Sequence, residues 1–102
     1  MLASLAVAAT GTARVALGTL AGTVIDPRGN PVSGASVTMQ TSDGQHPHAT
    51  RTNARGYFQF TDYAVGQYDL RAYFHGENSD WAKRIVVRSH KTTKIVLRLA
   101  RH

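Results

Sequence analysis

The sequence predicts an all-β domain, a sandwich of about seven short strands. Apolar and polar residues alternate with a period of two in most segments after residue 17, and no segment there repeats with the helical period of 3.6. Turn-forming residues recur every eight to twelve residues or so, which is typical of short consecutive strands. A length of 102 residues suits one domain with one core, and without cysteine that core must hold without disulfides.

Residues 1–17 differ from the rest of the chain, being rich in alanine and carrying a single charge, Arg14. The segment is too short and too weakly apolar to span a membrane. It matches the apolar part of a secretory signal, although the basic start is missing; a disordered N-terminal segment or an extra strand is the alternative. We expect the domain to occupy residues 18–102, with no membrane span. Residues that could precede a cleavage site are Ala6, Ala8 and Ala13.

Residues 22–37 form the first predicted hairpin, and its two strands alternate clearly. The turn at 26–29 places Asp first, Pro second and Gly fourth, where they accept a backbone hydrogen bond, preset φ and tolerate a positive φ, respectively. Residues 53–56 repeat this chemistry with Asn in place of Asp. The predicted inward residues of this hairpin's strands are Leu20, Gly22, Val24, Ala35, Val37 and Met39.

Five further strands are predicted. They cover residues 50–52, 57–60, 67–75, 81–88 and 92–99, and the intervening loops or turns cover 42–49, 53–56, 61–66 and 76–80. In these strands the inward residues are Phe58, Phe60, Tyr68, Leu70, Ala72, Phe74, Ile95, Leu97 and Leu99, and the outward residues include Asp69, Arg71, Tyr73, His75, Lys94, Val96 and Arg98. Tyr68 follows a turn and is expected to place its ring in the core and its hydroxyl on a nearby backbone group.

Three sequence blocks, in this order, resemble a known family. The first is Gly22, Val24, Asp26, Gly29, Pro31, Val32, Gly34, Ala35 and Val37; the second is Thr52, Asn53, Gly56, Phe58 and Phe60; the third is Gly66, Tyr68 and Leu70. Over residues 18–99 the chain is similar to the carboxypeptidase regulatory-like domain, a transthyretin-like (prealbumin-like) Greek-key β-sandwich. The resemblance implies a non-catalytic module, found beside metallocarboxypeptidase domains, in surface receptors or as a secreted domain. It therefore implies an extracytoplasmic location: secreted, periplasmic or at the cell surface.

The net charge of +6 lies entirely in the last third of the chain. Cations and carboxylates balance in residues 1–70, whereas residues 71–102 hold eight Lys and Arg against Glu77 and Asp80. If the last three strands share a sheet, they form a basic face that attracts anions. The alternative is a solvated surface that discourages edge pairing. The candidate binding face consists of Arg71, Tyr73, His75, Arg84, Arg88, Lys94 and Arg98.

Three functions compete at this point. The leading prediction is a non-catalytic structural or binding module that presents loops and the basic face to a protein or cell-envelope partner. The second is a carbohydrate-binding domain for an anionic polysaccharide, using Tyr73, Trp81 and the basic residues, although Trp81 is predicted to fill the core. The third is a small transthyretin-like hydrolase. Nucleic acid is an unlikely partner because no nucleic-acid motif accompanies the charge. A monomer or an edge-strand dimer fits the predicted fold.

Catalytic and cofactor motifs are not recognisable. There is no Gly-x-Ser-x-Gly elbow and no phosphate loop, and the tail at 99–102 lacks the Tyr-Arg-Gly-Ser ending of the hydroxyisourate hydrolases to which the resemblance would point. His46 and His48 are a candidate metal pair, but zinc normally needs three or four ligands. The sequence thus predicts no enzyme activity, no metal and no cofactor.

Overall fold

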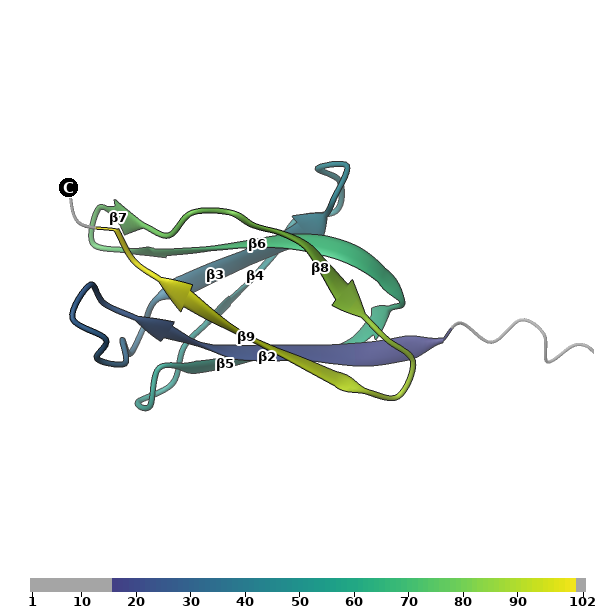
Figure 1. The fold of residues 1–102 in the computed structure, drawn as a ribbon, viewed down its shortest axis with the longest axis horizontal. Helices are drawn as coiled ribbons and strands as arrows, with labels where there is room; N and C mark the ends of the chain where they lie inside the picture. Colours follow the sequence, from purple (N-terminus) through teal and green to yellow (C-terminus); the bar gives the residue numbers. More distant parts are fainter. Residues whose placement is uncertain (1–15, 101–102) are drawn as a thin grey trace, which may run out of the picture.

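The computed structural model describes residues 16–100, which form two β-sheets packed face to face (Figure 1). One sheet has the order β5-β2-β9, with β2 at Leu17–Ile25, β5 at Tyr57–Ala64 and β9 at Thr92–Arg98. The other has the order β4-β3-β6-β7, and β8 also pairs with β6. Its strands are β3 (Ser36–Thr41), β4 (His48–Arg51), β6 (Gly66–Phe74), β7 (Glu77–Asn78) and β8 (Ala82–Val87). The predicted all-β sandwich is confirmed, with eight described strands instead of seven.

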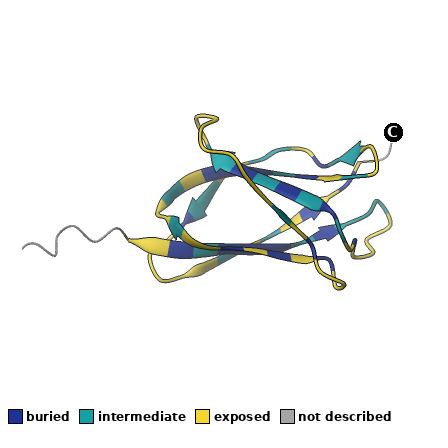
Figure 2. Ribbon diagram, turned by 180° about the vertical axis from the view of Figure 1, so that it is seen from behind, coloured by how far each residue is buried: buried dark blue, intermediate teal, exposed yellow. Residues whose placement is uncertain are grey.

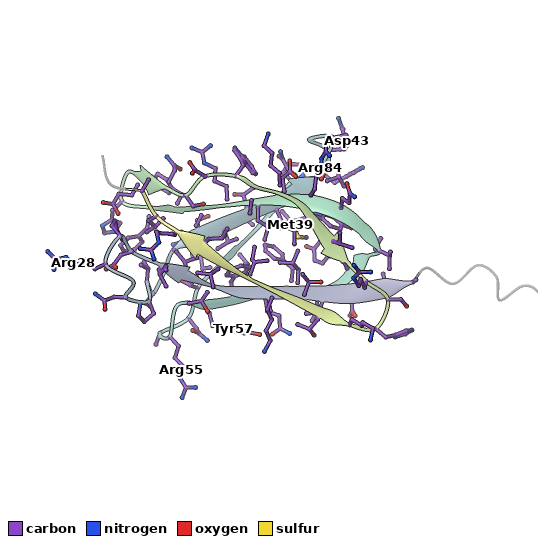
Figure 3. The ribbon with its side chains drawn as sticks, in the orientation of Figure 1. Arg28, Met39, Asp43, Arg55, Tyr57 and Arg84 are labelled. Carbon is purple, nitrogen blue, oxygen red and sulfur yellow. The ribbon has the colours of Figure 1, made fainter. Side chains whose placement is uncertain are left out.

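The core lies between the two sheets and contains the residues that alternation placed inward. Figure 2 shows the buried positions along the facing strands and the exposed ones in the connecting loops. Met39 lies between the layers in Figure 3, with 1% of its surface exposed. Burying such apolar side chains is the main stabilising term for a domain of this size. The fully enclosed side chains include Leu20, Val24, Val37, Met39, Phe58, Leu70, Val87 and Leu99.

The two predicted Asx turns have the same geometry. The Asp26 carboxylate accepts hydrogen bonds from the amides of Arg28 and Asn30, each at 2.9 Å. Asn53 repeats this arrangement with its own turn, accepting from Arg55 at 2.9 Å. The bond from the Asn30 amide is the main reason that the pKa of Asp26 lies below 3.8. The Asp26 turn follows the end of β2, and the Asn53 turn precedes the start of β5.

Tyr68 forms the predicted corner between β5 and β6. Its ring is buried, and its hydroxyl donates a hydrogen bond to the carbonyl of Ala64 at 2.6 Å. Burial is the main cause that raises the pKa of Tyr68 above 10.0. The corner fixes the point at which the chain passes from one sheet to the other.

Several element boundaries differ from the sequence prediction. Residues 61–66 were expected to turn, but β5 continues to Ala64 through a bulge, because Asp62 has a φ of 61° and adds a residue opposite β2. The sequence at Thr61 and Asp62 therefore resembles that of a turn, although the structure has a bulge there. β4 covers residues 48–51 instead of 50–52, and the predicted loop at 76–80 contains β7. Of the segment 1–17, residues 1–15 lie outside the described residues, and Leu17 begins β2.

Candidate binding surface

The predicted basic face is divided between the two sheets. β6 and β8 pair with each other, whereas β9 pairs in parallel with β2, from Thr19 opposite Thr92 to Ile25 opposite Arg98. The expectation that the last three strands share a sheet is therefore wrong. The turn at residues 88–91 moves the chain from one sheet to the other, and its closing bond runs from the Lys91 amide to the Arg88 carbonyl at 3.2 Å.

Arg71 and Tyr73 lie on the outer face of β6. Their register partners on β3 are Thr38 and Ser36, respectively, and Tyr73 also pairs with Asn78 of β7. Tyr73 is 51% exposed, which is unusual for so large an aromatic side chain. The neighbouring positions on β3 carry the small polar side chains of Ser36 and Thr38, so the Tyr73 ring projects beyond them.

Trp81 joins this face and is not a core residue. It is half-buried just before β8, and the guanidinium carbon of Arg71 lies 5.6 Å from the centroid of its ring. The expected core role was wrong because β8 starts one residue later, where Ala82 pairs with Leu70 and fills the inward position. An open hollow of about 280 Å³ results, lined by Thr38, Gln40, Arg71, Tyr73, Asn78 and Trp81.

The sequence had placed Asp69 outward in the row of Arg71 and Tyr73, but Asp69 is buried. Its carboxylate accepts hydrogen bonds from the Ser42 hydroxyl at 3.0 Å and from the Arg84 amide at 2.9 Å. Arg84 lies at a bulge of β8 with a φ of 57°, so its backbone turns toward Asp69 while its side chain stays exposed. Figure 3 shows Arg84 on the same side of the molecule as the loop of Asp43. Asp69 thus anchors Arg84 to this face.

The cations of β9 lie on the other sheet. Arg98 donates a hydrogen bond from Nη1 to the Pro27 carbonyl at 3.0 Å. Lys94 lines a second hollow, of about 350 Å³, beside Tyr57 and the 63% exposed Val96. Arg88 is exposed just beyond the end of β8.

Trp81 also connects the two sheets at the surface. Besides the hollow next to Arg71, it lines a third hollow, of about 330 Å³, together with Val96 and Arg98. The ring therefore forms a wall between a hollow on the β6 face and one on the side of β9. Of the seven predicted residues, Arg71 and Tyr73 share one hollow with Trp81, and Arg98 lines the other. We call Arg71, Tyr73, Trp81 and Arg98 the Trp81 surface.

His75 lies at the end of β6 beside this surface. Its φ is 46°, and its ring stacks on Phe74 with centroids 4.0 Å apart and planes 8° from parallel. It lines a small hollow of about 130 Å³ with Arg51 and Tyr73. Sequence reasoning missed Arg51 and Asn78 and gave Trp81 an outer role only in the carbohydrate-binding alternative, although the alternation of β3 does place Thr38 and Gln40 outward.

The described histidines do not converge on one site. Among residues 16–100, no group of three or more His, Cys, Asp or Glu side chains could hold a metal. His48 packs edge-on against Tyr63, with centroids 5.6 Å apart, while His46 sits in the exposed loop before it. His75 and His90 line different hollows. A hydrolase site of converging His and Arg side chains is thus not assembled from these four residues.

The hollow around His90 is larger, about 590 Å³, and lies where β2 begins. Its lining includes Asp62, Lys91 and Ala16. Because it borders the end of the described chain, we assign it no function. Within residues 16–100 no helix is long and apolar enough to cross a membrane.

Comparison with known proteins supports the architecture. The sequence model of the carboxypeptidase regulatory-like domain matches residues 19–100. No curated protein shows significant sequence similarity to this chain. The TIE protein of Bacillus anthracis superposes with a TM-score of 0.67 at 16% identity, over 82% of this chain and 16% of that protein.

Two further solved structures share the fold. BcpA, the major pilin subunit of Bacillus cereus, has a TM-score of 0.68 at 15% identity, over 85% of this chain and 31% of the pilin chain. The dioxygenase domain of a dioxygenase carbohydrate-binding protein fusion from Streptomyces sp. SirexAA-E has a TM-score of 0.50 at 14% identity, over 90% of this chain and 86% of that one. This chain spans less than a third of the TIE and BcpA chains, and at these identities the likeness concerns the fold alone.

Proposed function

Since this chain belongs to the carboxypeptidase regulatory-like domain family, we propose that it is a non-catalytic binding module that engages an anionic partner of the cell envelope. The proposed contact region is the Trp81 surface, and the exposed cations Arg84, Arg88 and Lys94 contribute further positive charge. We place the module outside the cytoplasm, either secreted, periplasmic or at the cell surface, which agrees with the signal-like composition of residues 1–17.

The observation that carries this proposal is that one aromatic ring lies between two hollows and that each hollow is lined by an arginine. Arg71 covers Trp81 from the β6 face, and Arg98 lines the hollow that Trp81 closes toward β9. The two sheets therefore supply charge to one continuous region although they do not form one face. A positive region of this kind raises the local concentration of an anionic partner and orients its approach.

The scaffold suits binding better than chemistry. The strands that carry Arg71 and Arg98 are held by ladders of backbone hydrogen bonds to β3 and β2, so their side chains start from a rigid support. The bulge at Arg84 is likewise held by a buried carboxylate. A pre-organised surface lowers the entropic cost of binding an extended polymer.

A comparison of binding to an anionic polymer and to a matched neutral polymer tests this function. We expect immobilised dextran sulfate to bind the full chain at about 50 mM salt and to lose it at about 500 mM, because screening shortens the reach of exposed charges. Unsubstituted dextran should not bind. The double variant Arg84→Gln with Lys94→Gln should weaken binding by about tenfold.

The control variant removes the same charge elsewhere. Arg28→Gln with Arg55→Gln alters two turn residues that project away from the body of the sandwich (Figure 3). It should bind nearly as the parent chain does. Equal losses in both double variants would show that net charge alone governs binding, and the proposed region would then be wrong.

A further inference from the structure

We infer that the hollow between Tyr73 and Trp81 binds a carboxylated sugar unit of an acidic polysaccharide, with Arg71 as the residue that receives the carboxylate. This inference rests on the proposed binding function and names the ligand class of the same surface.

The Arg71 side chain has N–H donors that no described residue accepts from. Its guanidinium carbon lies over the ring of Trp81, 5.6 Å from the ring centroid, within the range of a cation–π contact. Its Nε is buried without a hydrogen-bond partner among the described residues, so the donors open to a ligand are those on Nη1 and Nη2 at the end of the group. A planar guanidinium with open in-plane donors matches a carboxylate in a bidentate pair.

The carboxylate next in line on the same face of β6 cannot serve as that partner. Asp69 already accepts hydrogen bonds from the Ser42 hydroxyl and the Arg84 amide, and it is buried beneath them. Its role is to hold the β8 bulge and the 41–45 loop in place. An external anion is thus the complement that the position of Arg71 favours.

The rest of the lining suits a sugar ring. Thr38, Gln40 and Asn78 offer hydroxyl and amide groups that both donate and accept, as sugar hydroxyls require. Tyr73 adds an exposed amphipathic ring against which the C–H face of a pyranose can pack. The volume of about 280 Å³ is close to the lower end, roughly 300 Å³, of small-ligand pockets. An acidic peptide could satisfy Arg71, but it would leave most of these neutral groups without partners.

The hollow is also open toward a second subsite. Trp81 forms the wall between it and the hollow that Arg98 lines. A polymer could place a carboxylate near Arg71 and continue across Trp81 into that hollow, which both Arg98 and Asp80 line. The site should therefore prefer oligomers to single sugars, because the second contact becomes intramolecular.

The test compares oligogalacturonate with the same oligomer after methyl esterification, which keeps the sugar and removes the carboxylate charge. Trp81 is the only tryptophan, so its fluorescence reports binding directly. We expect oligogalacturonate to shift the emission and the ester not to do so. Arg71→Lys should weaken binding about tenfold or more although it keeps the charge, because an ammonium cannot form the bidentate pair.

Matched controls separate this site from general charge and from folding. Arg55→Gln, at an exposed position outside this hollow, should bind as the parent chain does, while Tyr73→Ala should bind more weakly. Equal binding of poly-glutamate and oligogalacturonate would overturn the sugar assignment, as would an unchanged affinity in Arg71→Lys. If dextran sulfate binds and oligogalacturonate does not, this inference fails while the proposed function stands. If neither polymer binds, both fail.

Discussion

The substitution Gly22→Ala should destabilise the domain sharply. Gly22 lies in the middle of β2, paired with Phe58 on β5 and Ile95 on β9. A Cβ atom there would lie 2.2 Å from the Ile95 carbonyl oxygen and 2.8 Å from the Phe58 ring. The oxygen belongs to a paired backbone, so the strand itself must move. Overpacking of this kind costs about 1–3 kcal/mol of folding free energy, and the rigid contact puts Gly22 toward the upper end.

The expected change is large enough to measure by thermal unfolding. About 2–3 kcal/mol corresponds to a fall of roughly 10–20 °C in Tm for a domain of this size. Gly66→Ala is the matched control, since a Cβ at Gly66 meets no atom within 4 Å. This substitution should leave the stability unchanged or raise it by about 0.5 kcal/mol, because alanine lowers the conformational entropy of the unfolded chain. If Gly22→Ala melts within a few degrees of Gly66→Ala, the close approach of β2 and β9 is not as the structure describes.

Three further predictions concern the polar groups that shape the corners. Thr52→Val should reduce the free energy of unfolding by about 1–3 kcal/mol in urea titrations. The buried hydroxyl of Thr52 accepts a hydrogen bond from the Ala35 amide at 2.9 Å and donates one to the Val32 carbonyl at 2.6 Å, and the substitution removes both. The control substitution Thr61→Val, at an exposed position, should change the stability little. Tyr68→Phe removes the bond to Ala64 and should cost about 1 kcal/mol. Because the raised pKa of Tyr68 favours the protonated folded state, the parent chain should lose stability as the pH rises above about 10, and the variant should lose less over that range. The lowered pKa of Asp26 stabilises the fold above pH 3.8 and ceases to do so as the pH falls through the folded value, so Asp26→Ala should flatten the acid side of the stability curve; an unchanged acid limb would contradict this.

The local structure of this chain could be predicted from the residues alone. Asp26 and Asn53 specify their turns because a side-chain oxygen bonds the amides two and four residues on, within the same short segment. The alternation of β3 and β6 placed the core residues correctly, since side chains on a strand point to opposite faces in turn. The corner at Tyr68 also followed, because its acceptor lies only four residues away. Asp62 is an exception, because residue types that predict a turn form a bulge there instead.

The binding surface depended on pairings between distant segments. Nothing near β9 indicates that it pairs with β2, some seventy residues earlier in the chain, and not with β8, so the seven predicted residues were divided between two sheets. Likewise, Trp81 reads as a core residue until the register of β8 places Ala82 opposite Leu70 and leaves the indole against Arg71. Strand alternation and turn hydrogen bonds involve residues only a few positions apart, so they can be predicted from the order of residues in the sequence. Which strands become neighbours depends on how all the apolar faces are buried at once, and only the folded chain establishes that.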